Sequence, residues 1–156
     1  MSEKNVIHKK WMKRAIFLAS LGKNTTSPNP RVGAIILDKD GILISEGFHY
    51  MAGTPHAEAM AFNNLKRDPK GGSMYVNLEP CCHQGKTPPC VDKIISSGIR
   101  NIHISIQDPD KRVSGRGIKL LKKAGIQVHL GLCEKESLEL NKDFIYKNIT
   151  KKAFGV

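Results

Sequence analysis

Two short segments carry the residues whose types and spacing could do chemistry. The first contains His56 and Glu58, two positions apart and just after Pro55. The second runs from Glu79 to Cys90 and contains three of the four cysteines, Cys81, Cys82 and Cys90. One imidazole and two thiolates suit Zn²⁺, and a zinc with three protein ligands keeps a fourth position for water, whose pKa it lowers. We therefore expect His56, Cys81 and Cys90 to bind one zinc ion.

Glu58 can provide the proton transfers that a zinc ion alone cannot. Hydrolytic removal of an amine requires a proton to be taken from water and delivered to the ring and then to the leaving group, which one carboxylate can do. The H-x-E pattern followed by Pro-Cys and a second Cys, with the Glu not a ligand, is typical of zinc nucleobase deaminases. The sequence therefore predicts Glu58 as the catalytic proton shuttle.

A structural zinc site is the main alternative for the cysteine cluster. Its ligands would be Cys81, Cys82, Cys90 and His83. Adjacent cysteines such as Cys81 and Cys82 point in different directions in an extended loop, so this arrangement is less favoured. A lone H-x-E is also weak by itself, because it often marks a helix start with a surface acid.

The surrounding pattern predicts the elements that would position these residues. Apolar spacing and turn residues indicate a helix over His56–Leu65, a strand over Ser73–Leu78 and a helix over Cys90–Ser97 ending at Gly98. The other expected strands are Val32–Leu37 and Ile42–His49, forming a hairpin, then Ile102–Ile106 and Ile126–Leu130. The other expected helices are Trp11–Leu21, Ile118–Ala124 and Glu134–Lys147. This alternation predicts an α/β domain with helices on both faces of a buried sheet.

Length and composition restrict the class of protein. A chain of 156 residues with 40% hydrophobic and 25% charged residues suits one compact domain. The net charge is +11, but 19 of the 25 basic residues are lysines scattered along the chain, so nucleic-acid binding is not favoured. No apolar run is long enough to span a bilayer, and residues 1–10 lack the apolar core of a signal peptide. We therefore expect a cytoplasmic protein without membrane contacts, whose clustered cysteines bind metal rather than form disulfides.

The segment Glu79–Cys90, EPCCHQGKTPPC, resembles the signature of the deaminase domain of the riboflavin-biosynthesis deaminase/reductase, in the cytidine-deaminase-like superfamily. The interval of nine positions between Cys81 and Cys90 agrees with that domain, whereas many zinc deaminases have an interval of three. Further similar stretches are Ser27–Gly33, Glu46–His49, Pro55–Glu58, Gln107–Pro109 and Ser114–Gly117.

The resemblance implies a three-layer α/β/α sandwich with a mixed central sheet of about five strands. It implies deamination of 2,5-diamino-6-ribosylamino-4(3H)-pyrimidinone 5′-phosphate to 5-amino-6-ribosylaminouracil 5′-phosphate and ammonia. The same resemblance gives His56, Cys81 and Cys90 as zinc ligands and Glu58 as the proton shuttle. Residues matching the substrate pocket of the family are Asn29, His49, Lys86 and Asp108.

The resemblance also implies a domain organisation. We expect residues 1–150 to form a single zinc-dependent deaminase domain and residues 151–156 to be a tail where a reductase domain would begin in the bifunctional family. No NADPH is expected to bind. The family resemblance suggests a homo-oligomer and leaves a separate reductase as a possible partner.

Two other functions stay open. The chain could be a zinc deaminase acting on tRNA adenosine or a free nucleotide, which strongly salt-dependent tRNA binding would support. It could also be a non-catalytic, zinc-stabilised subunit that docks a separate reductase. Zinc binding without deaminase activity would support that second alternative.

Overall fold

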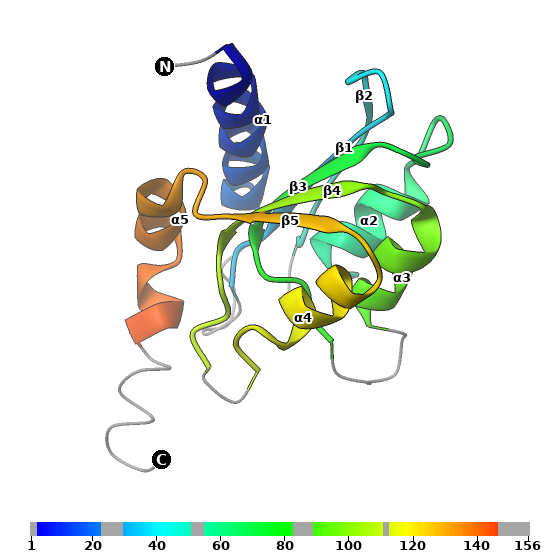
Figure 1. Cartoon of the computed structure of the whole chain (residues 1–156). Helices are drawn as coiled ribbons and strands as arrows, with labels where there is room; N and C mark the ends of the chain where they lie inside the picture. The colour runs from blue at the N-terminus through cyan, green and yellow to red at the C-terminus, as the bar shows by residue number, and fades with distance from the viewer. Residues whose placement is uncertain (1–2, 23–29, 51–54, 83–88, 111–112, 147–156) are drawn as a thin grey trace.

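In the computed structural model of the protein, a mixed five-stranded sheet forms the centre (Figure 1). The structure describes residues 3–22, 30–50, 55–82, 89–110 and 113–146. The strand order is β2-β1-β3-β4-β5. β1 pairs antiparallel with β2 and β3, whereas β4 is parallel to both β3 and β5. The strands are β1 (Gly33–Leu37), β2 (Leu43–Phe48), β3 (Ser73–Leu78), β4 (Asn101–Ile106) and β5 (Gln127–Leu130).

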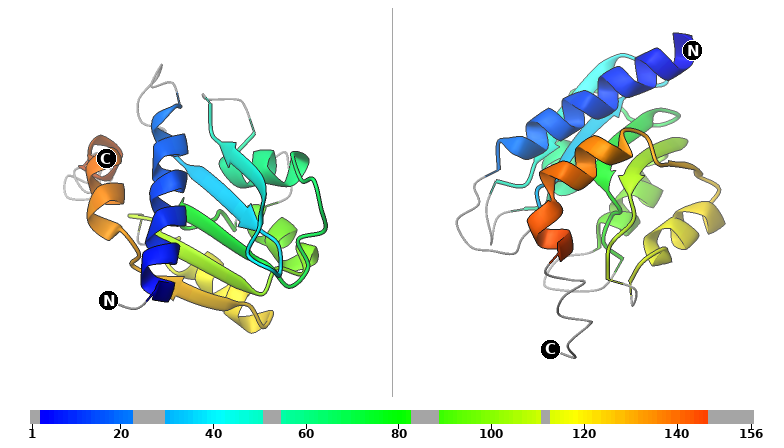
Figure 2. Two further views of the ribbon diagram at one scale, coloured as in Figure 1. Left: turned by 90° about the horizontal axis from the view of Figure 1, so that it is seen from above. Right: turned by 90° about the vertical axis from the view of Figure 1, so that its left-hand side faces the viewer.

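Helices cover both faces of this sheet (Figures 1 and 2). α1 (Glu3–Ser20) and α5 (Glu134–Leu140) lie on one face. The other face is covered by α2 (Ala57–Asn63), α3 (Cys90–Ser97) and α4 (Arg116–Lys123). The predicted three-layer α/β/α sandwich is therefore confirmed. No helix in the described part of the chain is long and apolar enough to cross a membrane.

Each face of the sheet has its own apolar core. Under α1 the core contains Met12, Ala15 and Leu18 from the helix and Ile35 and Tyr75 from the sheet. The larger core lies on the opposite face, between the sheet and α2, α3 and α4. Alternate side chains of β1 serve the two cores, because successive residues of a strand point to opposite faces. A continuous apolar run therefore marks a strand that is covered on both sides.

The predicted hairpin of β1 and β2 forms as expected from its turn residues. The backbone amide of Gly41 donates to the carbonyl of Asp38 at 3.0 Å, and Gly41 has a φ of +80°, which glycine adopts without strain. The Asp38 carboxylate accepts from the amides of Asp40 and Ile42 at 2.9 and 3.0 Å. These local bonds fix the turn that joins β1 to its antiparallel partner β2.

Gly47 sets how closely α2 approaches the sheet. A Cβ atom at residue 47 would overlap the carbonyl oxygen of Ala57 and lie 2.6 Å from the amide nitrogen of Ala61. The Ser45 hydroxyl also donates to the Ala61 carbonyl. These contacts fix the position of α2, and with it the position of His56 and Glu58 at its start.

Two predicted helices differ from the structure. α1 begins at Glu3 rather than Trp11, because polar residues of its first two turns still contact the sheet: the His8 Nδ1 lies 2.5 Å from the Tyr75 hydroxyl. The last helix, predicted as continuous over Glu134–Lys147, is interrupted at Asn141. Asn141 is buried, and its side-chain amide is bonded to the backbone of Arg31. Residues 142–146 resume a helical conformation after this interruption.

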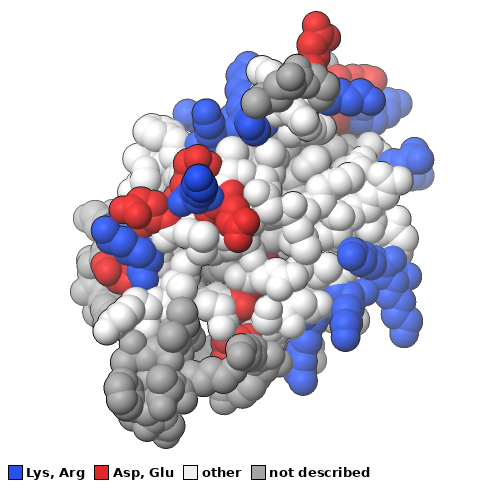
Figure 3. Space-filling view, turned by 60° about the vertical axis from the view of Figure 1, so that its left-hand side comes forward, with Lys and Arg blue, Asp and Glu red and all other residues white. Residues whose placement is uncertain are grey.

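Basic side chains do not form one continuous strip on the face drawn in Figure 3. Separate groups of Lys and Arg are divided there by uncharged surface and by acidic groups. This distribution agrees with the scattered lysines of the sequence and gives no support to an extended nucleic-acid interface on that face.

Candidate zinc site and active-site pocket

Three element ends bring the predicted zinc ligands together. His56 is the N-cap residue of α2, and Cys90 is the first residue of α3. Cys81 follows the end of the central strand β3 by three residues. The amide of Val91 donates to the Cys81 carbonyl at 3.1 Å, and the Cys90 amide donates to the Cys81 sulfur at 3.4 Å. These two bonds hold the loop after β3 against the start of α3.

The geometry of these three side chains fits a tetrahedral zinc ion. The His56 Nδ1 lies 3.7 Å from the Cys81 Sγ and 3.7 Å from the Cys90 Sγ. All three atoms lie within 4.8 Å of one another. Ligand atoms at ordinary Zn–N and Zn–S distances from a tetrahedral ion are about 3.5–3.8 Å apart. The donor set and its spacing therefore suit Zn²⁺ bound through the Nδ1 of His56.

The cluster also favours a thiolate. The hydrogen bond with Cys90 lowers the pKa of the Cys81 thiol to about 4, and the bond with His56 acts in the same direction. The same Cys81–Cys90 bond raises the pKa of Cys90, and the bond to Cys81 raises that of His56. A thiolate is the form of cysteine that binds metal, so one ligand is already poised in its binding form.

Glu58 lies in the first turn of α2, two residues after His56, and is 4% exposed. Burial raises the pKa of its carboxyl to about 7. A carboxyl with a pKa near neutrality can both accept and release a proton at physiological pH. Glu58 is therefore placed, and electrostatically suited, to act as a general acid and base.

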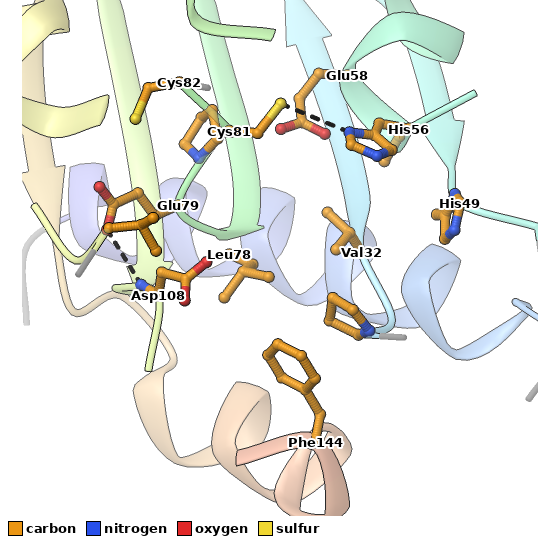
Figure 4. Close-up of a pocket in the computed structure, with 14 residues that line it drawn as sticks. Val32, His49, His56, Glu58, Leu78, Glu79, Cys81, Cys82, Asp108 and Phe144 are labelled. Carbon is orange, nitrogen blue, oxygen red and sulfur yellow. Dashed lines mark hydrogen bonds between the residues drawn. The ribbon is translucent and has the colours of Figure 1, made fainter. Parts of the chain in front are cut away.

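These residues line one end of a cavity of about 310 Å³ (Figure 4). His49 lies at its side, where the Nδ1 is 3.1 Å from the Pro55 carbonyl oxygen. The His49 ring meets the His56 ring edge-on, with centroids 5.6 Å apart. Asp108 lines the cavity on the side of β4. The structure thus brings His49, His56, Glu58, Cys81 and Asp108 to one pocket, with Cys90 completing the metal cluster.

Other sequence predictions concern substrate binding and the alternative zinc site. Asn29 and Lys86, predicted to bind substrate, lie outside the described residues, as does His83 of the alternative structural zinc site. Cys82 lines the cavity, and its sulfur points away from His56 (Figure 4). Among the described residues, the cluster able to hold a metal contains His56 and not Cys82, which favours the three-ligand arrangement.

Glu79 is a site residue to which the sequence motif alone assigns no role. Its carboxylate is 6% exposed and accepts hydrogen bonds from the amides of Asp108, Gly115 and Gly117 at 3.1, 3.0 and 3.1 Å. It therefore joins the loop after β3 to the loop after β4, which carries Asp108. Nothing in the sequence pattern indicates these partners, because they are backbone groups 29–38 residues away.

Apolar residues forming the rest of the cavity wall were also missed. They include Pro30, Val32, Leu78, Val113 and Phe144. Each belongs to a run that sequence patterns assign to a loop or to core packing, so no local signal marks it as lining a site.

Residues 5–106, which include the whole metal cluster, match the family model described as the cytidine and deoxycytidylate deaminase zinc-binding region. A diaminohydroxyphosphoribosylamino-pyrimidine deaminase of Buchnera aphidicola is 51% identical over 134 residues, covering 86% of this chain and 90% of that protein. The chain belongs to this deaminase family.

Other members of the family are longer. The riboflavin biosynthesis protein RibD of Aquifex aeolicus is 48% identical over 138 residues, which cover 88% of this chain and 38% of that protein. The structure of the Thermotoga maritima deaminase/reductase superposes with a TM-score of 0.90 at 43% identity, covering 96% of this chain and 43% of that one. The chain therefore spans less than half the length of these two relatives. The Aspergillus oryzae Rib2 deaminase, solved in complex with DARIPP, superposes with a TM-score of 0.67 at 25% identity, covering 93% of this chain and 99% of that one.

Proposed function

We propose that this deaminase acts in riboflavin biosynthesis. It would convert 2,5-diamino-6-ribosylamino-4(3H)-pyrimidinone 5′-phosphate to 5-amino-6-ribosylaminouracil 5′-phosphate and ammonia. The observation that carries the proposal is the 51% identity with the Buchnera deaminase over 90% of that protein's length. The cluster of His56, Cys81 and Cys90 beside buried Glu58 supports it independently, because these groups suit zinc-dependent deamination.

His56, Cys81 and Cys90 are the proposed zinc ligands. When bound, zinc would supply Lewis-acid activation of water, making it a nucleophile at neutral pH. The remaining chemistry belongs to the chain itself. Glu58 takes a proton from the attacking water and delivers it to the ring nitrogen next to the amine-bearing carbon. The water oxygen bonds to that carbon, and Glu58 moves the remaining proton from the new hydroxyl group to the leaving amine. The C–N bond then breaks, the carbonyl of the product forms and ammonia departs.

The substrate would be held by the other side chains of the cavity. Asp108 and His49 face the cavity from opposite sides and offer groups that can bond the pyrimidine or the sugar (Figure 4). We keep Asn29 and Lys86 as substrate-binding residues in the proposal because of the family resemblance. No NADPH site is part of the proposed domain, and a homo-oligomer or a reductase partner stays a prediction.

Ammonia release from the diaminopyrimidinone ribotide tests this function. Zinc-loaded protein is assayed with the ribotide, and cytidine, CMP and tRNA are assayed in parallel. We expect turnover of the ribotide alone. Turnover of another substrate instead would contradict the substrate assignment, and zinc binding without any turnover would support the non-catalytic alternative.

A further inference from the structure

The segment after α5 forms one wall of the pocket. Phe144 lines the cavity together with Pro30, Val32 and Val113. Its ring lies across the cavity from His56 and Glu58 (Figure 4). The reacting carbon of the substrate must lie next to Glu58, so Phe144 faces the part of the ligand that is remote from the reacting amine.

Asn141 ties this segment to the loop that precedes β1. Its side chain accepts a hydrogen bond from the Arg31 amide at 2.7 Å and donates one to the Arg31 carbonyl at 2.9 Å. Asn141 is 3% exposed, so both bonds are shielded from water. The two residues on either side of Arg31, Pro30 and Val32, both line the cavity.

A second buried amide holds the same loop from the sheet. The Asn77 side chain donates to the Arg31 carbonyl at 2.9 Å and accepts from the Gly33 amide at 2.8 Å. The loop is therefore held on one side by β3 and on the other by the C-terminal segment. The backbone carbonyl of Asn141 also accepts from the Ile145 amide at 3.0 Å, which starts the helical turn that carries Phe144. Asn141 thus fixes both the loop and Phe144.

We propose that Asn141 and Phe144 form a substrate-recognition element of the deaminase, which rests on the function proposed above. Phe144 packs against the bound ribotide on the side away from the zinc ligands. An aromatic ring can contact the ribose carbons or the edge of the pyrimidine there, but it has no group that could bind the phosphate. Asn141 is a positioning residue that holds Pro30, Val32 and Phe144 in one arrangement.

Phe144→Ala and Phe144→Leu test the contact, with Lys142→Ala as the matched control. Lys142 lies on the same segment, is exposed and pairs with Glu139 on the surface. We expect Phe144→Ala to raise KM about tenfold with a much smaller change in kcat, and Phe144→Leu to have an intermediate effect. The Lys142→Ala enzyme should match the wild type. An unchanged KM in Phe144→Ala would overturn the proposed contact.

Asn141→Ala and Asn141→Asp test the positioning role, with amide hydrogen exchange as an independent measurement. The alanine variant removes both bonds to Arg31, whereas aspartate keeps the acceptor and places a second oxygen against the Arg31 carbonyl. We expect faster exchange at the Arg31 amide in Asn141→Ala and a higher KM in both variants. The KM effect of Phe144→Ala should be smaller in the Asn141→Ala background, because the ring is already misplaced. A lower melting temperature with unchanged KM would assign Asn141 a structural role only.

The wild-type assay separates this inference from the proposed function. An active wild type with no KM effect in the Phe144 variants contradicts the recognition element alone. A wild type that uses another nucleotide contradicts the proposed substrate, and the variants are then compared with that nucleotide. A wild type with no activity on any of them contradicts both proposals.

Discussion

Glu58 and its neighbours show how the local environment turns common side chains into a reactive set. The carboxyl is buried at the start of α2, and that burial raises its pKa to about 7. In the same cavity, hydrogen bonds with Cys90 and His56 lower the pKa of the Cys81 thiol to about 4. Near pH 6 the pocket therefore holds a thiolate, the form of cysteine that binds metal, beside a carboxyl that keeps its proton.

Glu58→Gln should remove turnover and leave the metal in place. Glutamine has nearly the same shape but cannot take up or release a proton, so we expect kcat to fall by about 10²–10⁴-fold. Zinc content measured by atomic absorption should stay at the wild-type level. Glu46→Gln, on β2 and paired with Arg14 at 2.6 Å, is the control and should keep its activity. Near-normal kcat in Glu58→Gln would rule out the proposed proton transfers.

Cys90→Ser and Cys82→Ser separate the two arrangements proposed for the metal. Only Cys90 belongs to the cluster with His56 and Cys81, so Cys90→Ser should lose zinc and activity while Cys82→Ser keeps both. Metal content per chain after dialysis is the measurement. Equal loss of zinc in the two variants would favour the structural site instead.

At the scale of elements, helix starts and strand ends carry the candidate site. β3 and α3 match their predicted bounds, because the apolar run of β3 is flanked by polar residues and Gly98 ends α3 with a φ of +80°. His56, Glu58, Cys81 and Cys90 could therefore be placed from the sequence. The interruption at Asn141 could not, since its cause is a hydrogen bond to Arg31, 110 residues away. The roles of Glu79 and Phe144 were missed for the same physical reason, namely non-local partners.

Gly47→Ala should displace residues of the site although Gly47 itself does not line the cavity. The new Cβ would overlap the Ala57 carbonyl and push α2, with His56 and Glu58, away from β2. We expect a loss of about 1–3 kcal/mol in the free energy of unfolding and a lower kcat. Urea denaturation and the ammonia assay measure the two effects. Gly41→Asn, in open space at a φ of +80° that asparagine tolerates, is the control and should change neither by much.

At the scale of the whole molecule, a stack of rings joins α1 to the far edge of the sheet. The His103 ring on β4 stacks on Tyr75 at 4.6 Å and on His129 at 4.5 Å, and His8 from α1 lies 4.4 Å from it. Burial, with smaller effects of His8 and His129, lowers the pKa of His103 to about 3. No local sequence pattern indicates this cluster, because its members are separated by tens of residues.

The stability of the protein should therefore fall in mild acid. The unfolded chain protonates His103 below pH 6.5, whereas the folded protein resists protonation until about pH 3. The unfolded state thus binds more protons between these values, so stability is lost as pH falls from 6.5 towards 3. His103→Phe keeps the stack but cannot titrate, and its melting temperature should drop less than that of the wild type between pH 7 and about pH 5. Parallel pH dependence of the two proteins would contradict this assignment.

The bond between Asn141 and Arg31 also has a consequence for synthesis on the ribosome. The two residues are 110 positions apart, which at usual rates of translation is roughly 5–20 s of elongation. During that interval the emerging chain can pair β1, β2 and β3 and bring the cysteines together, yet the wall carrying Phe144 does not exist. A nascent chain stalled before residue 141 would expose the apolar lining of its pocket, and chaperones that recognise such surfaces would bind it there.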